Sequence, residues 1–329
     1  MIDSLSGQFS KGKAFFHLPG LFEFFNFYKK FLPIFREHRE WFYSWCDIAS
    51  VYGSPEDCLW AGGRIEESGL RCGDNELEQV RDLLNDFGIS ARLTFSNSLL
   101  RAEHLADEKC NLLCRIFGGD TGAGGGVCRV VKNGVILHSD LLLEYLKKNY
   151  PDFYFVSSTT KVLTDFSDFE AELDRADFSF VVPDFRLNKS FEKLGGLTQA
   201  QKDKVEFLCN ECCWAGCKDR RECYESVSRE VLERCAGGSP DGSVDAHICR
   251  APGGNKGYRF SLAMKNPAFI SLDDIQKVFL PMGFSNFKIE GRSLGSALLL
   301  EFILYYMTKP EFHINLREEL YLDNLLDLF

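Results

Sequence analysis

Alternating strand-like and helix-like segments limit most strongly what this chain of 329 residues can fold into. Short apolar runs that predict strands alternate with amphipathic segments that predict helices, as at residues 46–52, 76–87 and 89–95. The pattern recurs about seven or eight times with short links. Strands joined through helices form a parallel sheet, because each connection must cross back over the sheet. We therefore predict an α/β fold built on a parallel sheet.

The length and the motifs narrow this sheet to a barrel. No Gly-x-Gly-x-x-Gly follows the first predicted strand, which argues against a doubly wound, dinucleotide-binding sheet. A single TIM-like (β/α) barrel, either regular or incomplete or distorted, fits the length better. Further strands are predicted at residues 111–117, 135–138, 153–157, 178–182, 205–208, 258–263 and 284–289. Further helices are predicted at residues 99–106, 139–149, 168–175, 220–235, 272–279, 293–307 and 316–328.

The predicted domain organisation is one barrel with additions at both ends. The first 20 residues look irregular, and residues 21–42 form an amphipathic pattern with a stripe of phenylalanines interrupted by Pro33. We interpret residues 1–45 as an N-terminal helical extension and residues 46–329 as the barrel domain. The last two predicted helices close the domain.

Charge and cysteine usage indicate the environment of the protein. The formal net charge is −10, which disfavours nucleic acid as a partner. No apolar run of about 18 residues predicts a membrane span. No secretory signal pattern is visible at the N-terminus, so we expect a cytoplasmic protein. The 13 cysteines then indicate metal or redox chemistry more than disulfides.

Residues 205–223 combine a predicted strand with a dense group of thiols. The strand leads directly into five cysteines, and two more follow within reach: Cys209, Cys212, Cys213, Cys217, Cys223, Cys235 and Cys249. The spacings include Cys-x-x-Cys and Cys-x-x-x-Cys. Thiolates placed just after a strand can converge on a metal centre without ordering a long loop. We therefore predict a metal centre at the mouth of the barrel.

Polar residues follow most of the predicted strands, and in a parallel barrel the carboxyl ends of the strands carry the chemistry. The candidate substrate-binding residues are Tyr52, Arg64, Lys161, Asp184, Arg186, Asn188 and Asn210. The candidate catalytic residues are Glu211, Lys288, Glu290 and Arg292. Two readings of the glutamates stay open. They could act as a general acid and base, or Glu290 could form a structural ion pair with Arg292 or Arg64 that stabilises the barrel.

These stretches also carry a family resemblance. Residues 205–223 with Asn210-Glu211, Phe-Lys-Ile-Glu-Gly-Arg292, and Tyr52-Gly-Ser-Pro with Gly62-Gly-Arg64 resemble the peptidase U32 family. The resemblance runs from about residue 48 to the helix after Arg292 and implies a TIM-like barrel. It also implies a four-cysteine [4Fe–4S] cluster and oxygen-independent hydroxylation of RNA bases or quinone precursors, although other members are called collagenase-like peptidases.

The chain departs from the family in its cysteine spacing and its short length, and Cys223 stands where shorter relatives have histidine. Cys213 and Cys217 are our first choice as cluster ligands. Some relatives place an early ligand on the loop that carries Cys58, and Cys249 is our fourth choice. The alternates are Cys223, Cys209 and Cys212. Structural zinc on the same thiols is the alternative to iron.

Three functions remain as hypotheses. The first is an iron–sulfur enzyme acting on a small anionic molecule, held by the basic residues at the rim. The second is a peptidase, although no nucleophile–base pair or catalytic metal motif is recognisable. The third is a non-catalytic accessory or maturation protein whose cluster or zinc is structural or whose cluster passes electrons to a partner. A protein partner, or a homodimer or heterodimer, stays open as an expectation. Only the first and second are enzymes, and we expect an enzyme.

Overall fold

The computed structural model describes residues 12–64, 69–118, 131–237, 247, 249–251 and 258–321. These residues form one eight-stranded sheet in which neighbouring strands all run parallel. The strands are β1 (Ala14–Pro19), β2 (Cys46–Gly53), β3 (Ser90–Phe95), β4 (Gly134–Leu137), β5 (Tyr154–Ser157), β6 (Phe178–Val181), β7 (Glu206–Leu208) and β8 (Asn286–Lys288).

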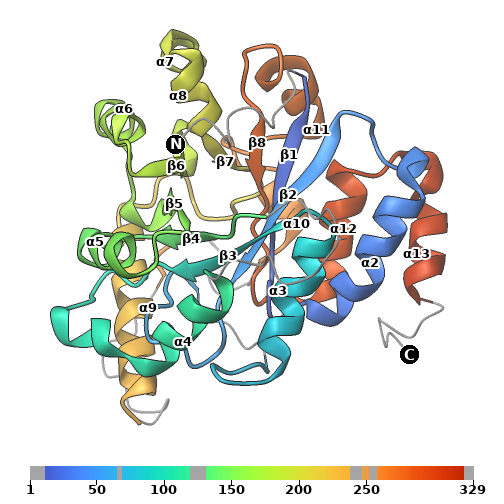
Figure 1. Cartoon of the computed structure of the whole chain (residues 1–329). Coiled ribbons are helices and arrows are strands. Elements are labelled where there is room, and N and C mark those ends of the chain that lie inside the picture. The colour runs from blue at the N-terminus through green and yellow to red at the C-terminus, as the bar shows by residue number, and fades with distance from the viewer. Residues whose placement is uncertain are drawn as a thin grey trace.

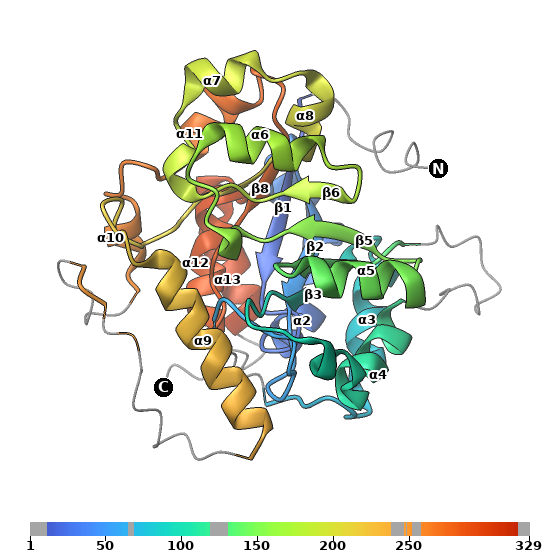
Figure 2. The ribbon, with the colours of Figure 1, turned by 90° about the vertical axis from the view of Figure 1, so that its left-hand side faces the viewer.

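Helices surround this sheet on its outer side (Figures 1 and 2). The longer ones are α2 (Phe25–Glu37), α3 (Glu76–Asp86), α4 (Glu108–Phe117), α5 (Asp140–Asn149), α6 (Phe166–Asp174), α9 (Arg220–Cys235), α12 (Ser296–Tyr306) and α13 (His313–Tyr321). The shorter ones are α7 (Phe191–Gly196), α8 (Gln199–Lys204), α10 (Phe260–Ala263) and α11 (Leu272–Asp274), the last continued by a π-helical turn at Ile275–Phe279. Figure 1 shows α2, α12 and α13 grouped on one side of the strands.

The order of the strands closes the sheet almost completely. It runs β6-β5-β4-β3-β2-β1-β8-β7, so the first strand lies between the second and the last. The two edge strands, β6 and β7, meet at a single parallel bridge between Val181 and Val205. The fold is therefore a TIM-like α/β barrel with one unsealed seam, which confirms the predicted fold class.

The prediction of an N-terminal extension is wrong, because the barrel begins at β1. Every residue of Ala14–Pro19 is buried, and the strand pairs with both β2 and β8. The helix after it, α2, is thus the first barrel helix and not an appendage. A strand buried on both faces shows no alternation of apolar and polar residues, so the sequence pattern gave no period to recognise.

Two segments that were predicted to be strands form helices instead. Residues 111–117 belong to α4, where the Asp107 side chain accepts a hydrogen bond from the Cys110 amide and so caps the helix. Residues 258–263 contain α10. Both segments are short apolar runs, and periodicity alone does not distinguish such a run in a strand from one in a buried helix.

The side chains of the barrel strands point alternately outward and inward, into two separate packed regions. Those that leave the barrel wall outward join the helices in the main hydrophobic core, including the phenylalanine stripe of α2 that was predicted to be core. Pro33 lies inside α2 without ending it. A smaller cluster fills the barrel interior and consists of Tyr52, Ile136, Tyr154, Val156, Phe180, Val182 and Leu208. The interior is therefore packed, and a cavity opens at its carboxyl end.

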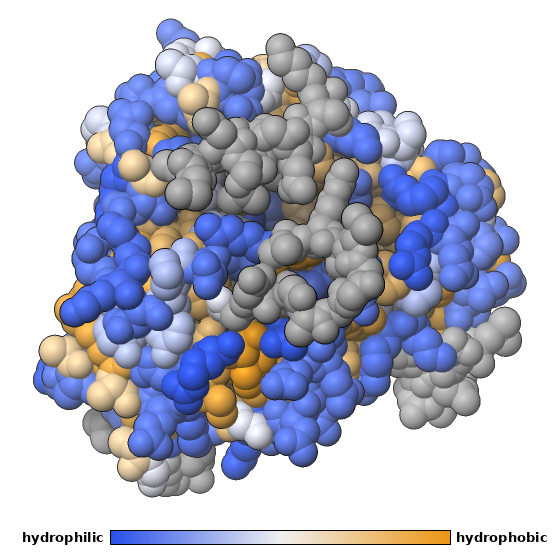
Figure 3. All heavy atoms as spheres, viewed as in Figure 1, coloured by the Kyte–Doolittle hydropathy of each residue, from blue (hydrophilic) through white to orange (hydrophobic). Residues whose placement is uncertain are grey.

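The surface is mostly hydrophilic on the face shown in Figure 3, with apolar patches between hydrophilic residues. In the part of the chain that the structure describes, no helix has the length and apolarity needed to cross a membrane.

Candidate active site

A cavity of about 830 Å³ opens at the carboxyl ends of the strands. Residues from the ends of β2 to β8 line it, together with the first turns of α9 and the segment around α10. Its described lining includes six basic side chains: Arg64, Arg220, Arg259, Lys265, Lys288 and Arg292. Only two acidic side chains, Glu211 and Glu290, accompany them. The cavity is therefore basic within an acidic protein, which favours an anionic ligand.

A network of buried charges lies inside the barrel beneath this cavity. Glu206 of β7 accepts hydrogen bonds from Arg92 of β3 at 2.5 Å and from Lys288 of β8 at 3.2 Å. His17 of β1 lies 3.6 Å from the same carboxylate and shares a hydrogen bond of 2.8 Å with Ser50. One carboxylate thus joins three strands across the barrel, and its removal would leave two buried cations facing each other.

Burial and neighbouring charges fix the protonation of this network. Burial alone would raise the pKa of Glu206, but the charge of Arg92 outweighs it, so the pKa lies well below its usual range. Burial and Arg92 lower the pKa of His17 to about 3, which keeps the imidazole neutral. Burial also lowers the pKa of Lys288 to about 8, against the opposing effect of Glu206. A lysine that ionises this close to neutral pH is a candidate for proton transfer or nucleophilic chemistry.

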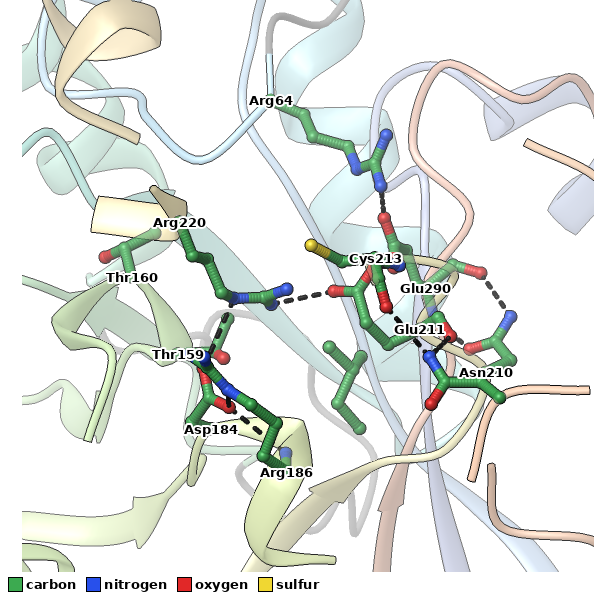
Figure 4. Close-up of polar contacts among 12 residues, drawn as sticks. Arg64, Thr159, Thr160, Asp184, Arg186, Asn210, Glu211, Cys213, Arg220 and Glu290 are labelled. Carbon is green, nitrogen blue, oxygen red and sulfur yellow. Dashed lines mark hydrogen bonds and ion pairs between the residues drawn. The ribbon is translucent and has the colours of Figure 1, made fainter. Parts of the chain in front are cut away.

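Arg220, on the first turn of α9, organises the rim on one side of the cavity (Figure 4). Its guanidinium donates to Glu211 at 2.7 Å and lies 3.4 Å from Asp184. Asp184 in turn holds Arg186 through two hydrogen bonds of 2.6 and 3.0 Å. Arg186 completes the chain by donating to the Cys217 carbonyl at 2.7 Å. This series of ion pairs fixes the start of α9 against the loop after β6.

Glu211 determines the shape of the loop that carries the first thiols. Its carboxylate accepts a hydrogen bond of 2.9 Å from the Cys213 amide while pairing with Arg220. Although burial would raise its pKa, Arg220 lowers it, so Glu211 stays ionised. Asn266 donates to the carbonyls of Glu211 and Cys213 at 3.1 and 2.9 Å. Glu211 is therefore a positioning residue for the thiol loop, which leaves little room for a role in proton transfer.

Glu290, on the other side of the cavity, pairs with Arg64 (Figure 4). Asn210 locks the backbone beneath it, accepting from the Glu290 amide at 2.7 Å and donating to the Glu290 carbonyl at 2.9 Å. One carboxylate oxygen of Glu290 is buried and has no hydrogen-bond partner among the described residues. A buried oxygen without a partner is expensive. A ligand with a hydroxyl or amino group could satisfy this oxygen from the cavity.

Gly62 allows the loop that carries Arg64 to approach the end of β3. A Cβ added there would lie 2.5 Å from the Ser96 carbonyl oxygen and 2.6 Å from the Asn97 amide nitrogen. We expect Gly62→Ala to lower the free energy of unfolding by about 1–3 kcal/mol, because backbone atoms must move to admit the methyl group.

Urea unfolding would measure this effect. Gly196→Ala is the matched control, since a Cβ at Gly196 meets nothing within 4 Å among the described residues. Equal midpoints for the two variants would contradict the close approach at Gly62.

The thiols after β7 gather beside the cavity. Cys212, Cys213, Cys223 and Cys249 line it. Burial raises the pKa of Cys213 to about 12 and that of Cys223 to about 11, and Cys217 lies near enough to both to add to these increases. Cys249 also raises the pKa of Cys223. Cys213, Cys217, Cys223 and Cys249 are thus electrostatic neighbours, and they form the group we call the rim thiols.

The rim thiols are not arranged as a finished metal site. Within the described ranges, no three Cys, His, Asp or Glu side chains are placed so that they could hold a metal ion. The chemistry of the donor set nevertheless fits an iron–sulfur cluster, which takes four thiolates. Such high thiol pKa values also argue against Cys213 or Cys223 as an activated nucleophile of a peptidase.

Several residues predicted for the site lie elsewhere. Cys58 is fully buried with its sulfur 3.6 Å from that of Cys110, and it does not line the cavity. Cys209 is buried in the barrel wall, as one reading of the sequence allowed. Lys161 donates to Glu172 at 2.6 Å, outside the cavity lining. Asn188 is buried and donates to the carbonyls of Leu208 and Ala268 at 2.8 and 3.0 Å.

The remaining predicted residues lie at the cavity or directly behind it. Tyr52, Arg64, Glu211, Lys288, Glu290 and Arg292 line it. Asp184, Arg186 and Asn210 support lining residues through the contacts described above. The structure therefore brings most of the predicted polar residues to one mouth, but it separates Cys58 and Lys161 from them.

Comparison with known proteins gives one structural neighbour to report. The chain is similar to the solved structure of the U32 peptidase Mk0906, with 15% sequence identity and a TM-score of 0.46. The similarity covers 86% of this chain and 96% of that chain. The neighbour carries the name of the family that the sequence motifs resemble. No protein-family model and no curated protein matches the chain.

Sequence reasoning missed Arg92, Glu206 and Arg220, the residues that hold the site together. Arg92 and Glu206 each interrupt an otherwise apolar strand segment, and a charge at such a position is rarely fully buried unless it is paired. That interruption was a usable signal for a buried pair. Arg220 gave no such signal, because it stands in a run of charged residues that reads as a solvated helix start.

Proposed function

We propose that the protein is an enzyme that binds a small anionic molecule at the barrel mouth, beside an iron–sulfur cluster. The observation that carries this proposal is the composition of the cavity. Among the described residues, six basic side chains and only two acidic ones line it, together with three of the rim thiols, Cys213, Cys223 and Cys249. In a parallel barrel this is the end where ligands bind and chemistry occurs.

The chain's own residues divide into three roles. Arg64 and Arg292 face the cavity and supply charge-assisted hydrogen bonds to a carboxylate or phosphate. Glu290 accepts a hydrogen bond from the ligand through its unpartnered oxygen. Arg220 and Glu211 hold the loop of Cys213 in place.

The rim thiols would hold the cluster, in place of the predicted set that included Cys58. A cluster bound there would supply one-electron transfer next to the ligand. Oxygen-independent hydroxylation of the ligand is one reaction of this type, and we retain it as the proposed reaction class. Zinc on the same thiols is the alternative occupant.

Metal and acid-labile sulfide analysis after anaerobic purification tests the cluster. We expect about four irons per chain. Serine in place of Cys213, Cys217, Cys223 or Cys249 should remove most of the iron, because each variant deletes one ligand. Cys58→Ser is the control and should keep the iron, since Cys58 packs against Cys110 away from the cavity.

A colourless protein with one zinc per chain, or iron lost equally from the Cys58 variant, would contradict this assignment. Calorimetric titration with oxalate tests the anion site separately. We expect Arg292→Met to weaken binding about 10- to 100-fold, the effect of losing a hydrogen bond to a charged group.

A further inference from the structure

We propose that Lys288 condenses with the carbonyl group of a small 2-oxo acid, forming a covalent imine at the floor of the cavity. The proposal rests on the proposed function in one respect, that the ligand is an anion. It extends that function by naming the chemical class of the ligand and the residue that binds it covalently.

Lys288 lies at the cavity with most of its side chain buried. It ends β8 and lines the cavity, yet only 6% of its surface is exposed. Its amine lies 3.2 Å from a Glu206 oxygen and 3.6 Å from the centre of the Tyr52 ring. The Tyr52 hydroxyl is itself held by the Ile289 carbonyl at 2.6 Å. These contacts fix the position of the amine beside the cavity.

The amine is partly neutral at physiological pH, as addition to a carbonyl requires. Burial and the charges of Arg92 and Arg292 lower the pKa of Lys288 to about 8, and Glu206 opposes them. Relative to an ordinary lysine, this gives roughly a hundredfold more neutral amine at pH 7. Glu206 does not restore the ordinary pKa of Lys288, because its carboxylate is also paired with Arg92.

Lys288 and Arg292 both line the cavity, and both lie near the Tyr52 ring. The Arg292 guanidinium carbon lies 5.9 Å from the centre of the ring that also contacts the Lys288 amine. A 2-oxo acid carries its carboxylate on the carbon next to its carbonyl. We assign Arg292 to the carboxylate and the Lys288 amine to the adjacent carbonyl carbon. This juxtaposition of a cation for the carboxylate and an amine for the adjacent carbonyl selects 2-oxo acids over simple aldehydes.

The reaction needs no oxidant. The nitrogen lone pair of the neutral amine forms a bond to the carbonyl carbon, and the electrons of the C=O π bond move to oxygen. Both amine protons are transferred to that oxygen through water in the cavity. The oxygen leaves as water while the C=N bond forms. The products are one imine and one water molecule.

Reductive trapping on the full-length protein tests the proposal. We would incubate the protein with pyruvate and sodium cyanoborohydride and locate the reduced adduct by peptide mass spectrometry. We expect Lys288 to carry most of the adduct, and oxalate to suppress it by occupying the same carboxylate site. Lys277→Arg is the control: Lys277 lies outside the cavity lining, is exposed and pairs with Asp273 at 2.8 Å, so its replacement should leave the adduct unchanged. Lys288→Arg should abolish it.

Because the main result is read from the wild-type protein, it does not depend on whether a Lys288 variant folds. Adduct spread over exposed lysines, or none at Lys288, would overturn the proposal. If oxalate binds but Lys288 gives no adduct, the imine is wrong and the anion-binding function stands. If oxalate does not bind and Lys288 gives no adduct, both the imine at Lys288 and the anion-binding function are wrong.

Discussion

Replacing Glu206 by glutamine is expected to lower the free energy of unfolding by about 3–5 kcal/mol, the cost of breaking a buried ion pair. Glu206 is fully buried and is the carboxylate that Arg92 and Lys288 share. Glutamine keeps the shape of the side chain but removes its charge. Lys288 can then lose its proton, but Arg92 cannot, and its guanidinium is left buried without a counter-charge. Urea unfolding at neutral pH measures the difference.

The same change at an exposed ion pair provides the control. Glu301 accepts from Arg317 at 2.9 Å, and nearly half of its side chain is exposed. Glu301→Gln should therefore change the stability by less than about 1 kcal/mol. Comparable losses in the two variants would show that the barrel interior tolerates the uncompensated charge.

The pH dependence gives a second measure of the Glu206 effect. The pKa of Glu206 is lower in the folded protein than in the unfolded chain, where it is about 4.3. Its stabilising effect is therefore complete above that pH and is lost as the pH falls toward the folded-state pKa. The difference between the wild type and Glu206→Gln should shrink as the pH falls below about 4.

The second large effect is expected from Arg220→Met. Arg220 is buried and is the direct ion-pair partner of Glu211 as well as a neighbour of Asp184. Without the guanidinium, Glu211 would be buried with an uncompensated charge, and we expect a loss of about 3–5 kcal/mol. Because Glu211 also holds the Cys213 amide, the thiol loop should loosen. Iron retained after gel filtration should fall together with the unfolding midpoint.

Arg221→Met is the matched control for this variant. Arg221 is the next residue on α9, is exposed, and makes one long hydrogen bond of 3.5 Å to the Lys161 carbonyl. Its replacement should affect neither stability nor iron content. A stable Arg220→Met protein with full iron content would show that Arg220 does not organise the thiol loop.

The fold was predictable because most of its strands carry a readable pattern. The strands at β2, β3 and β5 to β7 follow apolar runs bounded by helices, and their polar ends lie at one mouth as the barrel rule predicts. The first strand was not predictable in this way. Phe15, Phe16 and Leu18 are all buried, so nothing distinguishes Ala14–Pro19 from the apolar stretch that continues into α2.

The site was predictable residue by residue but not as a set of contacts. Arg64 and Glu290 were both candidates, and the sequence left open whether they pair; in the structure they do. Cys58 stands on a loop after a strand, like other site residues, but this loop turns outward and packs against α4 through Cys110. The direction of a loop depends on its packing partners, which a single sequence does not specify.

The single bridge between β6 and β7 has a consequence for how the protein matures. Within the described ranges, β7 pairs with β8 and otherwise makes this one bridge, and β8 is the last of the described strands to be synthesised. A nascent chain that has not yet emerged beyond Asn286–Lys288 therefore lacks the template on which β7 aligns. Loading of an inorganic centre onto the cysteines that follow β7 would have to be a late event, after translation has passed this point.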